Sequence, residues 1–75
     1  MALEYLLIAD GEEIHTTGNY VPREGETVQI SGHPKSTGVY TVYTVVNHVN
    51  PDHQLGETVY FKAGLPRVML LNNKK

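Results

Sequence analysis

The segment from Gly38 to Val49 constrains the fold of this chain more than any other stretch of its sequence. Nine of its twelve residues are Val, Thr or Tyr, and it contains neither proline nor a charged side chain. Because β-branched and aromatic side chains pack well on a pleated surface, the segment predicts a long β-strand. Alternate residues put apolar groups on both faces, whereas a strand with one solvated face alternates more cleanly. We therefore expect a central, bent strand against which the other strands pack.

The rest of the chain has the spacing of short strands separated by turns. Alternating or apolar runs that predict further strands occupy residues 3–9, 12–17, 27–31, 57–63 and 67–71. Asp10-Gly11 between the first two runs is typical of a tight hairpin turn, and Asn50-Pro51 favours a loop over residues 50–56. Helical periodicity over ten residues is absent from the sequence. The pattern indicates an all-β protein, a small SH3-like barrel of five to six strands.

Seventy-five residues are enough for one domain, residues 1–75, with a thin core. The apolar side chains at alternating positions of the expected strands should form that core. They are Val28, Ile30, Tyr40, Val42, Val59 and Phe61. Among these, Phe61 is the one large aromatic hydrocarbon in the chain, so its truncation is expected to unfold the domain.

Turn and core residues from Pro22 onward resemble those of a known class of small barrels. The matching positions are Pro22, Arg23, Gly25, Glu26, Val28, Gly38, Tyr40, Val42, Val45, His48, Val59 and Phe61. This layout resembles SH3-like barrels and, more narrowly, short proteins of bacteriophages and bacteria. The resemblance covers about two thirds of the chain and implies a fold rather than an activity. The chain has no Trp, so the proline-rich peptide binding of signalling SH3 domains is not implied.

Charge is distributed unevenly along the chain. The net charge is −2, with six acidic and two basic residues in residues 1–37. Nucleic-acid-binding proteins usually carry a basic stripe, so this distribution disfavours nucleic acid and favours a basic protein partner. The alternative is that the acidic residues only keep a small barrel soluble. Absence of a basic, apolar leader and of a membrane-length apolar run predicts a cytoplasmic protein, in a host cell or virion if phage-encoded.

Residue types that carry chemistry are present but poorly arranged. The four histidines, His15, His33, His48 and His53, lack the spacing of a metal site, and there is no Cys. Lys35-Ser36-Thr37 lacks the glycine pattern and following helix of a phosphate-binding loop. The two serines lie outside any nucleophile motif. We therefore predict no catalytic residues, no cofactor and no metal, and the chain is not expected to be an enzyme.

The leading interpretation is a non-enzymatic protein-interaction module, for example a phage accessory or virion protein. The alternative is a barrel that binds single-stranded nucleic acid by stacking bases on its tyrosines. Tyrosine is also a favoured interface anchor. The predicted partner-binding residues are Tyr20, Tyr43, Val45, Glu12 and Glu13.

Self-association is a further expectation from the sequence. The first and last predicted strands and the central strand all carry apolar groups on both faces, more than one small barrel can cover. A two-fold homodimer through Tyr43, Val45 and part of the first or last strand would cover the excess. The alternative is a strongly curved central strand that turns both of its faces into one core.

Overall fold

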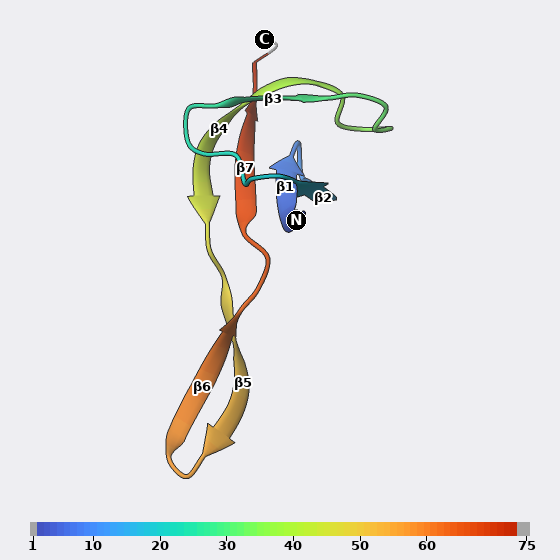
Figure 1. The fold of residues 1–75 in the computed structure, drawn as a ribbon. Coiled ribbons are helices and arrows are strands. Elements are labelled where there is room, and N and C mark those ends of the chain that lie inside the picture. Colours follow the sequence, from blue (N-terminus) through green and yellow to red (C-terminus); the bar gives the residue numbers. More distant parts are fainter. Residues whose placement is uncertain (1, 74–75) are drawn as a thin grey trace.

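The computed structural model describes residues 2–73, and all regular structure within that range is β-strand. The strands are β1 (Leu3–Ala9), β2 (Glu12–Gly18), β3 (Thr27–Ile30), β4 (Gly38–Val46), β5 (Val49–Leu55), β6 (Thr58–Ala63) and β7 (Arg67–Asn72). Five of them form one sheet in the order β2-β1-β7-β4-β3, whereas β5 and β6 form a separate two-stranded sheet. Figure 1 shows the two parts, which we call the body (residues 2–48 and 64–73) and the arm (residues 49–63). The expected all-β class is confirmed.

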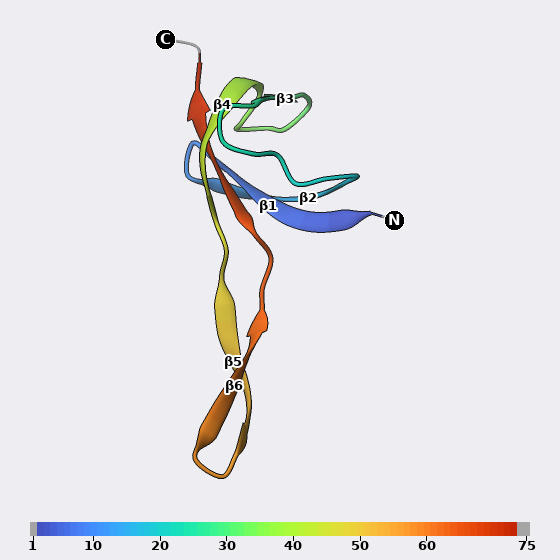
Figure 2. The same cartoon turned by 60° about the vertical axis from the view of Figure 1, so that its left-hand side comes forward.

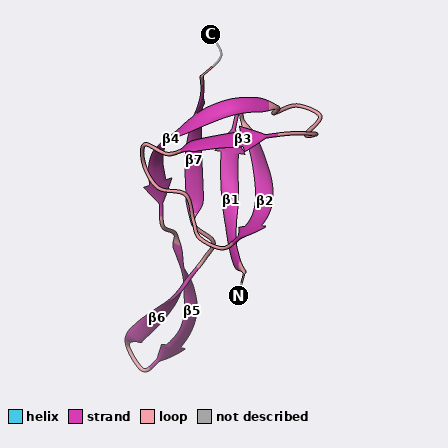
Figure 3. Ribbon diagram, turned by 45° about the horizontal axis from the view of Figure 1, so that its top comes forward, coloured by secondary structure: helices cyan, strands magenta, loops and turns pink. Residues whose placement is uncertain are grey.

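The body is a single sheet that curls into a half-barrel (Figure 3). β1 and β2 form an antiparallel hairpin, and the predicted turn at Asp10-Gly11 has the positive φ angles, 52° and 80°, that such turns require. β7 lies between β1, to which it is parallel, and β4, to which it is antiparallel. The strand predicted to be the centre of the fold, β4, is therefore internal, but β7 occupies the middle of the sheet.

Side chains from β1, β4 and β7 form most of the core. The buried members are Tyr5, Leu7, Ala9, Tyr40, Val42, Val68 and Leu70. Val28 and Ile30 from β3 are half-buried against this cluster, as the alternation in their strand predicts. The predictions for Tyr40, Val42, Val28 and Ile30 as core residues are thus confirmed.

An irregularity in β4 explains how that strand carries apolar residues on both faces. The pairing register with β7 shifts between Val42, opposite Leu70, and Thr44, opposite Met69. The extra residue bends the strand and turns Val45 toward the core. Regular alternation would put Val45 and Val42 on different faces of the strand. The bulge puts both on the core face and leaves Tyr43 exposed. The expected bend in the central strand is therefore present.

Two buried hydroxyl groups fasten the β3–β4 loop and β4 to the first hairpin. Ser36, with no exposed surface, donates its Oγ hydrogen to the carbonyl oxygen of Ala9 at 3.0 Å. The Tyr40 hydroxyl donates to the Asp10 carboxylate at 2.8 Å. Burial, reinforced by the hydrogen bond and charge of Asp10, raises the pKa of Tyr40 above its ordinary value. In Lys35-Ser36-Thr37, the segment compared above with a phosphate-binding loop, Ser36 therefore has a structural role: it holds the β3–β4 loop against the first hairpin.

Two predictions about the arm are wrong. Residues 50–56 were expected to form a loop, but Val49–Leu55 is strand β5. Val59 and Phe61 were expected in the core, but they are 46 % and 58 % exposed on β6. The physical reason is that β6 pairs only with β5, and no other element covers either strand. Within residues 2–73 no helix has the length and apolar character needed to cross a membrane.

Candidate interaction surface

The arm is a continuation of the β4–β7 ladder beyond the edge of the body. The backbone N–H of Gly64 donates to the carbonyl oxygen of His48 at 2.7 Å, so pairing passes from the body into the arm. Figures 1 and 2 show the arm leaving the body as a twisted ribbon in two different views. Every residue of β5 and β6 is exposed. The arm therefore offers both faces and both edges to solvent.

The dimensions of the molecule reflect this projection. Its extents are 52 × 27 × 24 Å, and its radius of gyration is 14.9 Å. A compact domain of this length has a radius of gyration of about 11 Å. The difference arises because a fifth of the chain, residues 49–63, adds length without adding to the core.

One face of the arm is apolar and free of charge. Residues directly opposite each other on paired strands project from the same face of a sheet. Three such pairs form this surface, which we call the apolar face: Val49 with Ala63, Pro51 with Phe61, and Gln54 with Val59. Val49 and Phe61 are 59 % and 58 % exposed. Soluble domains seldom leave side chains of this kind together in water without a partner.

The other face of the arm is polar and internally satisfied. His53 stacks on Tyr60 with ring centroids 4.7 Å apart and an interplanar angle of 5°. The Asp52 carboxylate accepts a hydrogen bond from His53 Nδ1 at 2.9 Å when that nitrogen is protonated, and it lies 3.8 Å from Lys62 Nζ. The strand residues that carry charge, Asp52 and Lys62, thus interact with each other.

A register shift in β5 creates this division into faces. Pairing slips between Pro51 and His53, so that Asp52 is an extra residue in the ladder. Without that bulge, alternation would place His53 on the same face as Pro51. With the bulge, His53 joins the polar face, and Gln54 joins Pro51 on the apolar face.

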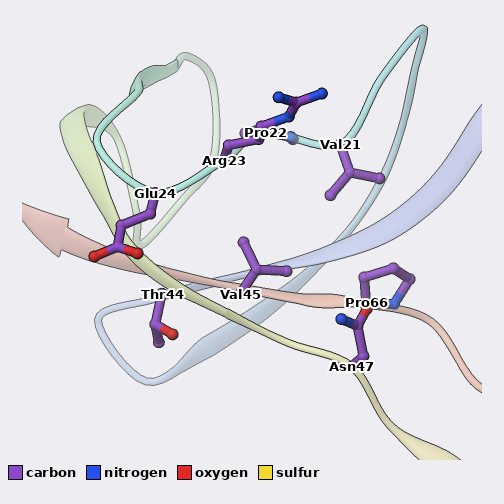
Figure 4. Close-up of a pocket in the computed structure, with 8 residues that line it drawn as sticks. All are labelled: Val21, Pro22, Arg23, Glu24, Thr44, Val45, Asn47 and Pro66. Atoms are coloured by element: carbon purple, nitrogen blue, oxygen red, sulfur yellow. The ribbon is translucent and has the colours of Figure 1, made fainter.

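A shallow hollow lies on the body at the root of the arm. It has a volume of about 440 Å³, and its lining includes Val21, Val45, Pro66 and Asn47. In Figure 4 the side chains of Val21 and Val45 point toward each other across this space, with Pro66 and Asn47 at the end from which the arm leaves. The lining is mixed, with Val21, Val45 and Pro66 beside the charged Arg23 and Glu24. Because the hollow lies at the root of the arm, we treat it together with the arm as one candidate interaction surface.

The residues predicted to bind a partner do not form one surface. Tyr20, 60 % exposed, lies in the loop after β2, and Tyr43, 49 % exposed, lies at the bulge of β4. Val45 lines the hollow and packs against the core. Glu12 and Glu13 are neighbours on β2, which β1 and β7 separate from β4. Val45 alone among the five belongs to the candidate surface.

Glu12 and Glu13 also have cations beside them already. Glu13 Oε2 accepts a hydrogen bond from Arg67 Nη1 at 2.8 Å, which connects β2 to β7 across β1. Glu12 Oε2 lies 4.0 Å from Lys35 Nζ. These intramolecular pairs reduce the negative field available to a basic partner at this site.

The histidines lie in separate parts of the structure. His15 is on β2, His48 is at the root of the arm, and His53 is on β5. His33 lies in the β3–β4 loop, where its Nδ1 accepts hydrogen bonds from the backbone N–H groups of Lys35 and Ser36. Among residues 2–73, no three His, Cys, Asp or Glu side chains come together as a possible metal site.

Sequence analysis missed the arm as a functional element, although signals for it are present. Gly56-Glu57 connects β5 to β6 directly, and Gly56 has a φ of 61°, as in tight hairpin turns. Asn50-Pro51 and the bulge at Asp52 obscured the alternation of β5, which made the strand resemble a loop. A proline in β5 is itself typical of an edge strand, since proline cannot donate to a ladder.

Comparison of the chain with protein-family models, with curated proteins and with solved structures gave no match. The functional interpretation therefore depends on the geometry of the body and the arm.

Proposed function

We propose that this chain is a non-enzymatic protein-interaction module and that the arm is its binding element. The observation that carries the proposal is the apolar face, where Val49, Val59 and Phe61 are between 46 % and 59 % exposed. Removing hydrophobic surface of this kind from water is favourable by about 25 cal/mol per Å² of apolar area, so a partner that covers it gains binding free energy. Aromatic anchors such as Phe61 are enriched in the central, fully buried part of protein interfaces.

The charges on the arm support a protein partner over nucleic acid. Binding of single strands uses aromatic side chains inside a basic groove that follows the phosphates. The arm has the stacked pair His53 and Tyr60, but the nearby cation Lys62 is beside Asp52. The whole chain carries a net charge of −2, which repels a phosphate backbone.

The positions of the perturbed ionisable groups also support binding rather than catalysis. Active sites commonly place groups with shifted pKa values inside a cleft. In this chain burial raises the pKa of Tyr5 and of Tyr40, and both phenols belong to the core of the body. Neither lines the hollow or the arm.

The proposal is tested by comparing two variants that each place one charge on an exposed apolar position. Phe61→Asp changes the apolar face, whereas Leu71→Asp changes the body, where Leu71 is 60 % exposed. The immobilised full chain and both variants are incubated with soluble protein from the source cell and with purified copies of the chain. We expect Phe61→Asp to lose the bound protein and Leu71→Asp to retain it.

Two results would contradict the proposal. One is equal binding by Phe61→Asp and the unchanged chain, since the arm would then have no part in recognition. The other is tight binding of a single-stranded oligonucleotide, measured by fluorescence anisotropy, that weakens steeply as salt is added. That second result would identify the chain as a nucleic-acid-binding barrel.

A further inference from the structure

We infer that the partner of the arm is a second copy of this chain, bound in a two-fold dimer with the two apolar faces packed together and the arms antiparallel. The inference rests on the proposed function, because it assigns an occupant to the same surface. It relocates the self-association expected from the sequence, which had been placed on Tyr43 and Val45 of β4.

The surface area of the chain provides the first argument. Its accessible surface is 5456 Å², whereas a compact monomer of its mass, 8.4 kDa, exposes about 4,600 Å². The excess is about 850 Å² per chain. A standard stable interface removes about 800 Å² from each partner. A dimer that removed this excess would bring each chain to the exposure of an ordinary folded domain.

The distribution of charge provides the second argument. A two-fold interface brings the same patch of both copies together, so a charge near the two-fold axis meets its own copy. None of the six residues of the apolar face is charged, and the face is thus compatible with itself. Asp52 and Lys62 interact on the opposite face, where packing of the apolar faces would leave them in water.

The length of the arm determines what else the dimer must contact. A seven-residue strand such as β5 spans about 23 Å, and two paired strands are about 10 Å wide, so one face projects onto about 230 Å². This is less than a stable interface needs from each partner. In an antiparallel pair, the tip of one arm lies beside the root of the other. Val59, 46 % exposed and next to the tip on the apolar face, would then meet the partner's hollow, whose lining includes Val21, Val45 and Pro66.

Sedimentation equilibrium on the full chain, from low to high micromolar concentration, tests the inference. We expect the unchanged chain and Leu71→Asp to reach twice the monomer mass of 8.4 kDa. Phe61→Asp at the centre of the interface should raise the dimer dissociation constant about 30-fold or more, as expected for an interface hot spot. Val59→Asp near the tip should raise it by about tenfold. Circular dichroism should show that all variants remain folded.

A cross-linking measurement tests the arrangement of the arms. The chain has no Cys, so Pro51→Cys introduces a single thiol on the apolar face of each arm, opposite Phe61 at the centre of the proposed interface. A short bismaleimide should join two copies of this variant, and should fail to join copies of a Leu71→Cys control. Equal cross-linking of both variants would overturn the arm-to-arm arrangement.

The outcomes separate this inference from the proposed function. A monomer mass for the unchanged chain at every concentration rejects the dimer. If Phe61→Asp then still abolishes capture of a different protein, the arm remains a binding element with another occupant. If the chain is monomeric and neither variant alters capture, both the inference and the proposed function are wrong.

Discussion

The short strands β3 and β6 have nearly the same sequence pattern but opposite environments. β3 is Thr27-Val28-Gln29-Ile30, and β6 begins Thr58-Val59-Tyr60-Phe61, so both place an apolar side chain at every second position. Val28 and Ile30 pack against the core of the body, whereas Val59 and Phe61 are exposed on the arm. Alternation thus predicts the period of the backbone correctly in both cases. It does not specify what will cover the apolar face.

The difference lies in the neighbours of each strand. β3 pairs with β4, whose Tyr40 and Val42 are buried with β1 and β7 on the concave side of the half-barrel. β6 pairs only with β5 and has no third strand beside it. A two-stranded hairpin alone is marginally stable in water, because it cannot bury an apolar face. We therefore propose different roles for the body, which has its own core, and the arm, which has none: the first for folding and the second for contact.

The sharpest test of this comparison is a pair of truncations to alanine, one in the body and one in the arm. Leu7 is 5 % exposed, so Leu7→Ala should lower the free energy of unfolding by about 2–5 kcal/mol. Phe61→Ala should change it by no more than about 0.5 kcal/mol, as for other surface positions. Urea unfolding at a concentration low enough to exclude association measures both. If Phe61→Ala lowered the free energy of unfolding as much as Leu7→Ala does, Phe61 would have to be a core residue.

Alkaline pH should show the burial of Tyr40 in the body by a smaller effect. Burial raises the pKa of Tyr40 in the folded chain above its ordinary value of 10.0, which means that folding favours the neutral phenol. This contribution to stability is complete below about pH 10 and is lost as pH rises from there through the pKa of the folded state. Replacement by Phe removes the titrating group, so the melting temperature of Tyr40→Phe should fall less steeply above pH 10.

Tyr60→Phe on the arm provides the matched control for the loss of a tyrosine hydroxyl at neutral pH. Tyr60 is 44 % exposed and stacks on His53 outside the core. Its replacement should leave the unfolding midpoint unchanged, whereas Tyr40→Phe removes the buried hydrogen bond to Asp10 and should lower the midpoint. If Tyr60→Phe lowered the midpoint and Tyr40→Phe did not, the proposed assignment of body and arm to folding and contact would need revision.

The smallest expected effect concerns one ion pair in each region. Glu13→Gln breaks the hydrogen-bonded pair with Arg67 that connects β2 to β7, and should cost about 0.2–1 kcal/mol of unfolding free energy at low salt. Added salt should reduce the difference, because it screens exposed charges. Lys62→Gln, which removes the partner of Asp52 on the arm, should leave the unfolding midpoint of the body unchanged. Equal losses for both variants would show that the arm unfolds together with the body.

The sequence alone determined the period of the backbone and the position of most turns. Tyr40 and Val42 in a run of β-branched residues predicted a buried strand, and Asp10-Gly11 predicted a hairpin, because such preferences act within a few residues. Among the candidate site residues, Val45 was named from the sequence and lines the hollow. Phe61, the proposed anchor, was also singled out, but as a core residue.

Only the tertiary structure decided which apolar faces are covered. Val59 and Phe61 have the local pattern of core residues, and their exposure depends on where β5 and β6 leave the ladder of β4 and β7. The bulges beside Val42 and Pro51 each shift the alternation by one residue, so they reassign every later side chain in the strand to the other face. Burial is a property of distant segments brought together, and no local preference along the chain encodes it.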